Sequence, residues 1–301
     1  MRVSTSQLYA TNLAGLSKQN ADIAKLQQQL GSGSKLLSPS DNPADATRLV
    51  NIDRAIDRNE QFKINGDFAS NRLRQSETTL SAVADGVERI NGLVFSSLAK
   101  DATSRAQLAV QLRDELSVIT DLANTRDANG DYLYAGHDVN TEPFDDSGAN
   151  VVYSGDANQR SIQIADGRRV SDGNSGEEIF ENLNGGRSLF RMIEDFITVL
   201  ENPLSTPTAI ETANDTATTD LVAAKDKLTT VRNSIVSRIG MIENEQQINI
   251  QMTRILKDQR SEINDVDLTE IALQLQQLQV SLQAAQQTFV KVQELSLFNF
   301  I

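Results

Sequence analysis

The sequence predicts a mainly α protein: a long antiparallel helical coiled-coil bundle formed by the N- and C-terminal regions, with a small β-rich domain inserted in the middle. Apolar residues recur at alternating spacings of three and four in both terminal regions. Charged residues make up 23% of the chain and aromatic residues only 5%, which suits long helices buried along Leu, Ile, Val and Ala stripes. Between about residues 127 and 186, Gly, Asp and Asn interrupt short β-type runs.

The first helix is expected to begin at a capping box, Ser4-x-x-Gln7, and to stop at Gly31-Ser32-Gly33. Spacings of three to four place its apolar residues on one face. This stripe consists of Tyr9, Leu13, Leu16, Ile23, Leu26 and Leu30. A break follows, and a second helix should start where Asn42 can cap free N–H groups and Pro43 fits the first helical position.

Long helices are predicted on both sides of the central region. The heptad pattern between residues 73 and 94 is nearly unbroken, and the helical pattern continues to about residue 125. Helix returns at 189–200, breaks near Pro203 and Pro207, and resumes as a long helix up to residue 255. Because one isolated helix cannot bury such a stripe, these segments require partner helices.

The central region, residues 131–186, is expected to form the small β-rich outer domain. Its β-type runs are 132–134, 151–153 and 161–164, and Asp166-Gly167 is a turn signal after the last of them. Surface insertions tolerate change better than an assembly seam. We therefore expect deletion of residues 137–180 to spare export and assembly more than removal of the last ten residues.

The last helix has the strongest pattern in the chain. A polar stretch at 258–265 should precede it, and Asp267-x-x-Glu270 should cap its start. We expect the two terminal helices to pair with each other and to carry a seam for assembly with partner subunits, although a purely intrachain core would give the same periodicity. The seam residues are Leu16, Ile23, Leu26, Leu30, Leu268, Ile271, Leu275, Leu278, Leu282, Phe289 and Val292. The outer face of the last helix is mostly Gln, which would let identical copies pack without like-charge repulsion, although an ordinary solvated face would have the same composition.

This pattern divides the chain into three regions. Residues 1–42 and 264–301 are expected to form a terminal helical coiled-coil assembly domain. Residues 43–130 and 187–263 should form a helical bundle domain, and residues 131–186 the β-rich domain.

Composition excludes several classes of function. The net charge of −13 disfavours binding to nucleic acid or anionic lipid, because phosphate would be repelled. The absence of Cys removes disulfides, thiolate metal sites and Cys nucleophiles. No run approaches the roughly 18 apolar residues of a membrane helix, and the first residues lack the apolar core of a secretory signal, so we expect neither membrane insertion nor signal-dependent secretion.

Apparent chemical motifs have simpler explanations. Ser32-x-x-Lys35 and the Ser-Asp-Asn at 40–42 imitate two parts of a penicillin-recognising enzyme, but they lie almost adjacent and no Lys-Thr-Gly is present. Caps and turns explain the same residues. We therefore expect no enzymatic activity and no catalytic residues.

Metal binding is also disfavoured. Asp127, Asn129 and Asp131 copy the first ligands of a calcium loop, but Tyr132 replaces the required Gly and Asp138 the bidentate Glu. His137 is the only histidine, too few for a His-based cluster or triad. The sequence therefore predicts no metal ligand and no cofactor-binding residue.

Both ends of the chain resemble the flagellin family. Residues 30–44, Leu-Gly-Ser-Gly-Ser-Lys-Leu-Leu-Ser-Pro-Ser-Asp-Asn-Pro-Ala, resemble its N-terminal signature, and residues 282–292 and 295–299 resemble its closing helix. Within the family the chain resembles the subunits at the hook–filament junction more than flagellin itself. Its last residues, 297–301, lack flagellin's usual terminal Leu-Leu-Arg, and residues 131–136, 143–144 and 153–156 are similar to the middle domain of the junction subunits.

The resemblance implies a structural role in the bacterial flagellum. The terminal helices would line a tube, and the β-rich domain would face solvent. Implied partners are flagellin, a neighbouring hook-associated protein, copies of the chain itself in a ring, and an export chaperone before secretion. The protein would leave through the flagellar export apparatus and act outside the cell. A small flagellin and a signalling coiled coil are the alternative readings, and an enzyme is a third class.

Overall fold

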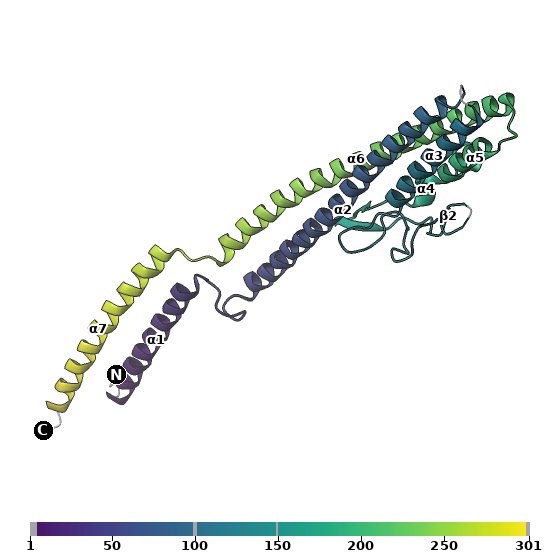
Figure 1. Cartoon of the computed structure of the whole chain (residues 1–301). Helices are drawn as coiled ribbons and strands as arrows, with labels where there is room; N and C mark the ends of the chain where they lie inside the picture. Colours follow the sequence, from purple (N-terminus) through teal and green to yellow (C-terminus); the bar gives the residue numbers. More distant parts are fainter. Residues whose placement is uncertain (1–4, 99–100, 149, 299–301) are drawn as a thin grey trace. The chain divides into compact units, whose positions relative to one another are not determined.

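The computed structural model describes residues 5–98, 101–148 and 150–298, which divide into two compact units. Unit 1 comprises residues 1–58 and 251–301, and unit 2 comprises residues 59–250. Figure 1 shows the elements. The helices are α1 (Thr5–Ser32), α2 (Pro43–Phe95), α3 (Ala102–Ala123), α4 (Gly176–Phe180), α5 (Leu189–Glu201), α6 (Pro207–Asn264) and α7 (Leu268–Phe298), with a 3₁₀ turn η1 (Asn184–Gly186). The strands are β1 (Phe144–Asp145), β2 (Val152–Tyr153), β3 (Ser161–Ala165) and β4 (Arg168–Ser171).

Unit 2 is built on an antiparallel pairing of α2 with α6. The predicted heptad residues Leu73, Leu80, Val87 and Ile90 are all at most 1% exposed and belong to one continuous core. Polar contacts fix the register: Arg232 pairs with Glu77 at 2.7 Å, and Lys225 with Glu88, also between α6 and α2. The apolar heptad pattern therefore determines which side chains of α2 are buried, and the charged residues beside it determine which residues of α2 and α6 lie opposite each other.

Helices α3 and α5 pack against each other and join the same core. Gly86 of α2 permits close approach of α3, because a Cβ there would lie 3.1 Å from Ile119. Asp101 caps α3 through the backbone N–H of Ser104 at 2.8 Å, and Ser188 caps α5 through that of Arg191 at 3.0 Å.

The β region contains two separate two-stranded antiparallel sheets, β1–β2 and β3–β4. Side chains from two helices form hydrogen bonds with the backbone of β3. Asn65 of α2 donates to the carbonyl of Gln163 at 2.7 Å, and Asn249 of α6 donates to that of Ile164 at 3.0 Å. The aromatic rings of Phe144, Phe180 and Phe190 meet in pairs at 4.9–5.7 Å. The β region thus shares its core with the helices of unit 2.

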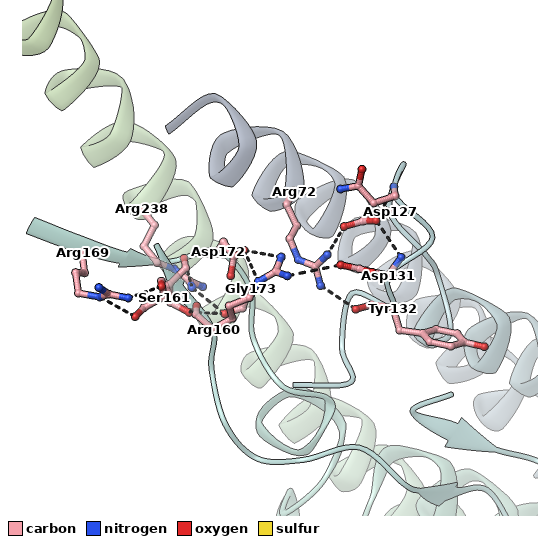
Figure 2. Close-up of polar contacts among 12 residues, drawn as sticks. Arg72, Asp127, Asp131, Tyr132, Arg160, Ser161, Arg169, Asp172, Gly173 and Arg238 are labelled. Carbon is pink, nitrogen blue, oxygen red and sulfur yellow. Dashed lines mark hydrogen bonds and ion pairs between the residues drawn. The ribbon is translucent and has the colours of Figure 1, made fainter. Parts of the chain in front are cut away.

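Arginines also hold the loops of this region (Figure 2). Arg72 of α2 pairs with Asp127 and donates to the carbonyl of Tyr132 at 2.8 Å. Both charged side chains of the pair are nearly buried, at 5% and 6% exposure. Arg160 pairs with the buried Asp172 at 2.7 Å. These bonds satisfy loop groups that would otherwise be buried without partners.

Three details differ from the sequence-based predictions. Residues 132–134 are not a strand, because only Tyr132 forms an isolated bridge, to Arg126, and the backbone groups around it bond within a loop. The polar stretch at 258–265, expected only to precede the last helix, is itself helical and continues α6 to Asn264, since polar residues are compatible with an exposed helix. Strands β1 and β4 and helix α4 were not predicted. Ser4 of the predicted capping box lies outside the described residues.

The predicted region boundaries fall near the helix breaks between α1 and α2 and between α6 and α7. The two compact units divide elsewhere, at 58/59 and 250/251, so that one end of α2 and one end of α6 belong to unit 1. Residues 131–186 lie within unit 2.

Candidate assembly surface

In unit 1 the terminal helices α1 and α7 pack side by side (Figure 1). The rings of Tyr9 and Phe289 lie 5.3 Å apart between centroids, and Gln19 donates to the Ser281 hydroxyl at 3.3 Å. Asp267 caps α7 as predicted, because its carboxylate accepts from the backbone N–H groups of Thr269 and Glu270 at 2.9 and 3.1 Å. The chain's two remote ends are therefore brought together along one interface.

The predicted seam residues differ in burial. Only Ile271 is buried, at 8% exposure, while Leu30 and Leu268 at the ends of the helices are exposed. The remaining described members are half-buried: Leu16, Ile23, Leu26, Leu275, Leu278, Leu282 and Phe289. Val292 lies in α7, but its side chain is outside the described residues. A seam built from two helices alone thus leaves most of its apolar side chains partly open to water.

The packing between α1 and α7 is also incomplete near Gln19. A cavity of about 310 Å³ lies there, and Gly15, Leu16, Ala285 and Phe289 are among its lining residues. The Gln19 Oε1 atom is buried without a hydrogen-bond partner in the described part of the chain. An unpaired buried acceptor is unfavourable in a finished core. This part of the seam therefore has room and an acceptor for a further contact.

Helix α7 has a second apolar stripe that the sequence analysis missed. Leu273 and Val280 are 57% and 60% exposed, and with Ala284 they line a shallow groove whose rim is Gln276, Gln277 and Ser281. Leu278 and Val280 are two residues apart, about 200° around the helix, so this stripe faces away from the seam. The sequence signal for this stripe is the seven-residue spacing of Leu273 and Val280. It was overlooked because most of the residues around them are Gln, and the whole face was therefore taken as polar.

The segments that lead into the terminal helices pair with each other. Gly33 takes φ +69° directly after α1 and ends the helix, as glycine commonly does. The N–H of Lys35 donates to the Asn264 carbonyl at 2.6 Å, and the Ser34 hydroxyl bonds the Asn264 side chain at 2.7 Å. These contacts join the α1–α2 connection to the α6–α7 connection.

The Ser-Asp-Asn at 40–42, set aside as a catalytic motif, forms a turn and a cap. The Asp41 carboxylate accepts from Lys25 Nζ at 2.9 Å and from the backbone N–H groups of Ser38 and Leu37. The hydrogen bond from Lys25, then that from Ser38, lowers the pKa of Asp41. Asn42 accepts from the N–H of Asp45 at 3.3 Å, which is the predicted cap.

Charge is divided unequally between the units. Unit 1 has 11 Lys and Arg against 11 Asp and Glu, a net charge of zero, whereas unit 2 has 17 against 30, a net charge of −13. The whole net charge of the chain therefore resides in unit 2. Like-charge repulsion between copies is correspondingly weakest at unit 1.

Within residues 5–98, 101–148 and 150–298, no group of three or more His, Asp or Glu side chains could hold a metal ion. In the calcium-like loop at 127–131, the Asp127 carboxylate pairs with the guanidinium of Arg72. None of the helices in the described part of the chain is long and apolar enough to cross a membrane.

Comparisons with known proteins agree with this geometry. Residues 3–138 match the model of the bacterial flagellin N-terminal helical region. The chain is 27% identical to flagellar hook-associated protein 3 of Escherichia coli and 26% identical to that of Salmonella typhimurium, with 99% of each chain covered in both alignments.

Solved structures show the same fold. A flagellar hook-associated protein from Vibrio parahaemolyticus superposes with a TM-score of 0.69 at 18% identity, covering 75% of this chain and all of that one. FlgL of Xanthomonas campestris gives 0.64 at 20% identity, covering 70% and 99%. Hook-associated protein 3 of Legionella pneumophila gives 0.65 at 17% identity, covering 70% and 98%. Over its full length the chain is therefore similar to flagellar hook-associated protein 3, and its N-terminal part, residues 3–138, matches the flagellin family model.

Proposed function

We propose that this protein is a structural subunit of the bacterial flagellum that joins the hook to the flagellin filament. The observation that supports it most directly is the incomplete packing of the terminal helices. Helix α7 has apolar residues on two opposite faces, and α1 covers only one of them. An apolar stripe left open in one chain is typical of a surface that another helix covers after assembly.

Seam and stripe would have different roles in assembly. The seam, including Leu275, Leu278 and Leu282, holds α1 to α7 and gives the terminal unit its shape. The stripe at Leu273 and Val280 meets helices of neighbouring subunits. The zero net charge of unit 1 supports close packing of copies, because no long-range repulsion opposes it there.

The partners follow from this role. On one side the chain would contact a neighbouring hook-associated protein, on the other flagellin, and laterally copies of itself in a ring. Before assembly the exposed stripe would promote premature association, so a chaperone that covers it in the cytoplasm suits the surface. Exit through the flagellar export apparatus then places the protein outside the cell. Its chemistry would be packing, without catalysis or a cofactor.

Deletion of the gene tests this function. The expected phenotype is a hook that remains on the cell while flagellin is released into the medium, and the wild-type gene should restore filaments. A filament subunit, the alternative function, gives a different result: its loss removes filament protein itself, and no other flagellin accumulates in the medium. Filaments of normal length on the deletion strain would contradict both functions.

A further inference from the structure

Four Asn-Gly pairs occur in the described chain: Asn65-Gly66, Asn91-Gly92, Asn129-Gly130 and Asn184-Gly185. This dipeptide is chemically labile, because the nitrogen of an unhindered Gly can attack the preceding Asn side chain. The reaction requires an Asn side chain free to approach that nitrogen. The structure gives the four pairs very different freedom.

Asn129-Gly130 lies in the loop at 127–131, where no helix constrains the backbone. Asn129 is exposed, and its side chain has no hydrogen-bond partner among the described residues. Gly130 takes φ +88°, and nothing lies within 4 Å of the position a Cβ would occupy. The one bond on the attacking nitrogen is its donation to the Asp127 carbonyl at 3.0 Å, in a solvent-exposed turn.

The other three pairs are restrained. Asn65 and Asn91 are inside α2, where the next backbone nitrogen is directed along the helix to a carbonyl four residues back. Asn65 also donates to the Gln163 carbonyl at 2.7 Å, and the Asn91 Oδ1 atom is buried. Asn184 donates to the carboxylate of the buried Asp220 at 2.8 Å, so its side-chain amide is held by a hydrogen bond, unlike that of Asn129.

We propose that Asn129 is a site of spontaneous deamidation in this protein. The Gly130 nitrogen loses its proton and bonds to Asn129 Cγ, the Cγ–Nδ2 bond breaks, and ammonia leaves. The resulting succinimide ring is then opened by water, which gives either aspartate or isoaspartate at position 129. No oxidant, reductant or enzyme is needed.

Either product changes the loop. A carboxylate at 129 lies in sequence between Asp127 and Asp131, whose carboxylates already pair with the guanidinium groups of Arg72 and Arg160 (Figure 2). Isoaspartate also lengthens the backbone by one atom, within a turn where Asp127 Oδ1 accepts from the N–H groups of residues 129 and 131 at 2.8 and 3.1 Å. The modified loop should therefore open more readily.

Peptide mass spectrometry of the purified full-length chain, incubated at mildly alkaline pH, tests the proposal. Residue 129 should convert more than ~10-fold faster than residues 65, 91 and 184, because attack requires a near-contact geometry that only this loop permits. Gly130→Ala should slow conversion at 129, since the added methyl group hinders the attacking nitrogen. The matched variant Gly185→Ala should leave conversion at 129 unchanged.

Asn129→Gln keeps the amide but requires a less favourable six-membered ring, so it should abolish the fast conversion while preserving the thermal melting of the chain. This variant provides an independent test in case Gly130→Ala fails to fold, since the alanine would have to adopt a strained positive φ. The proposal is overturned if position 65, 91 or 184 converts as fast as 129. It is equally overturned if Asn129 stays intact, or if a folded Gly130→Ala protein converts at the wild-type rate.

Discussion

At the scale of single residues, the Arg72–Asp127 pair has the largest consequences for unit 2. It ties α2 to the loop that leads from α3 into the β region, and both charges are almost out of contact with water. A buried pair contributes little over a well-packed apolar pair, but leaving one of its charges alone is strongly unfavourable. Its main contribution is thus to specify where the loop sits.

Asp127→Asn should lower the free energy of unfolding by about 3–5 kcal/mol, because Arg72 remains charged and buried. Asp131→Asn is the matched control: its carboxylate is 25% exposed and lies 3.6 Å from Arg160, so its loss should cost about 1 kcal/mol or less. Urea unfolding measures both. Equal losses of unfolding free energy in the two variants would show that the buried Arg72–Asp127 pair stabilises the fold no more than the partly exposed Arg160–Asp131 pair does.

Tyr153 should make unit 2 sensitive to alkali. Burial raises the pKa of Tyr153 from 10.0 to about 12, and its hydroxyl donates to the Asp156 carbonyl at 2.8 Å. The neutral form is therefore favoured by folding, so its stabilisation is complete below pH 10 and is lost as pH rises through about 12. Tyr153→Phe should flatten the fall of stability in this window. An unchanged alkaline profile would mean that another group causes the transition.

At the scale of elements, the helices were predictable and the strands only in part: the predicted runs 151–153 and 161–164 correspond to β2 and β3, whereas β1 and β4 were not predicted. Heptad spacing identified α2, α6 and α7 because each repeats one pattern over several turns. Strands β1 and β4 are only two and four residues long, too short for alternation to show, and β1 depends on tertiary contacts of Phe144. The seam pattern was visible in the sequence. Its partial burial was not, because periodicity says which residues share a face but not what covers that face.

Deletion of residues 137–180 should be more damaging than the sequence indicated. Phe144, Ile164, Ile179 and Phe180 are each at most 1% exposed and belong to the core of unit 2. Removing one such aromatic side chain costs about 3–5 kcal/mol. We therefore expect the deletion protein to unfold cooperatively at a much lower temperature than the full chain. A melting midpoint within a few degrees of the full chain would show that the β region folds independently.

At the scale of the whole molecule, the charge division predicts how salt affects self-association. Copies that meet through a neutral unit 1 still repel through unit 2, which has a net charge of −13. Raising the ionic strength shortens the screening length from ~30 Å at 0.01 M to ~10 Å at 0.1 M and weakens that repulsion. Sedimentation of the purified chain should show association that strengthens with salt. Association that weakens with salt would indicate an interface held by complementary ion pairs.

In the proposed function, the seam holds the terminal helices together and the stripe on the opposite face of α7 joins neighbouring subunits. Leu278 and Val280 lie on these two faces of the same helix. In Leu278→Asp a charge enters a half-buried seam, which should cost about 1–3 kcal/mol and lower the helix content of the monomer. Val280 is 60% exposed, so Val280→Asp should leave monomer melting unchanged. Val110→Asp, at a 57% exposed position on α3, is the matched control in unit 2.

The most direct test is to introduce Val280→Asp into the deletion strain and to measure filament attachment beside monomer melting. Val280→Asp should melt normally and yet lose filaments, because the added charge would have to be desolvated against a neighbouring subunit. Val110→Asp should retain filaments. Normal attachment of filaments by Val280→Asp, with normal melting, would contradict the claim that this stripe is an assembly surface.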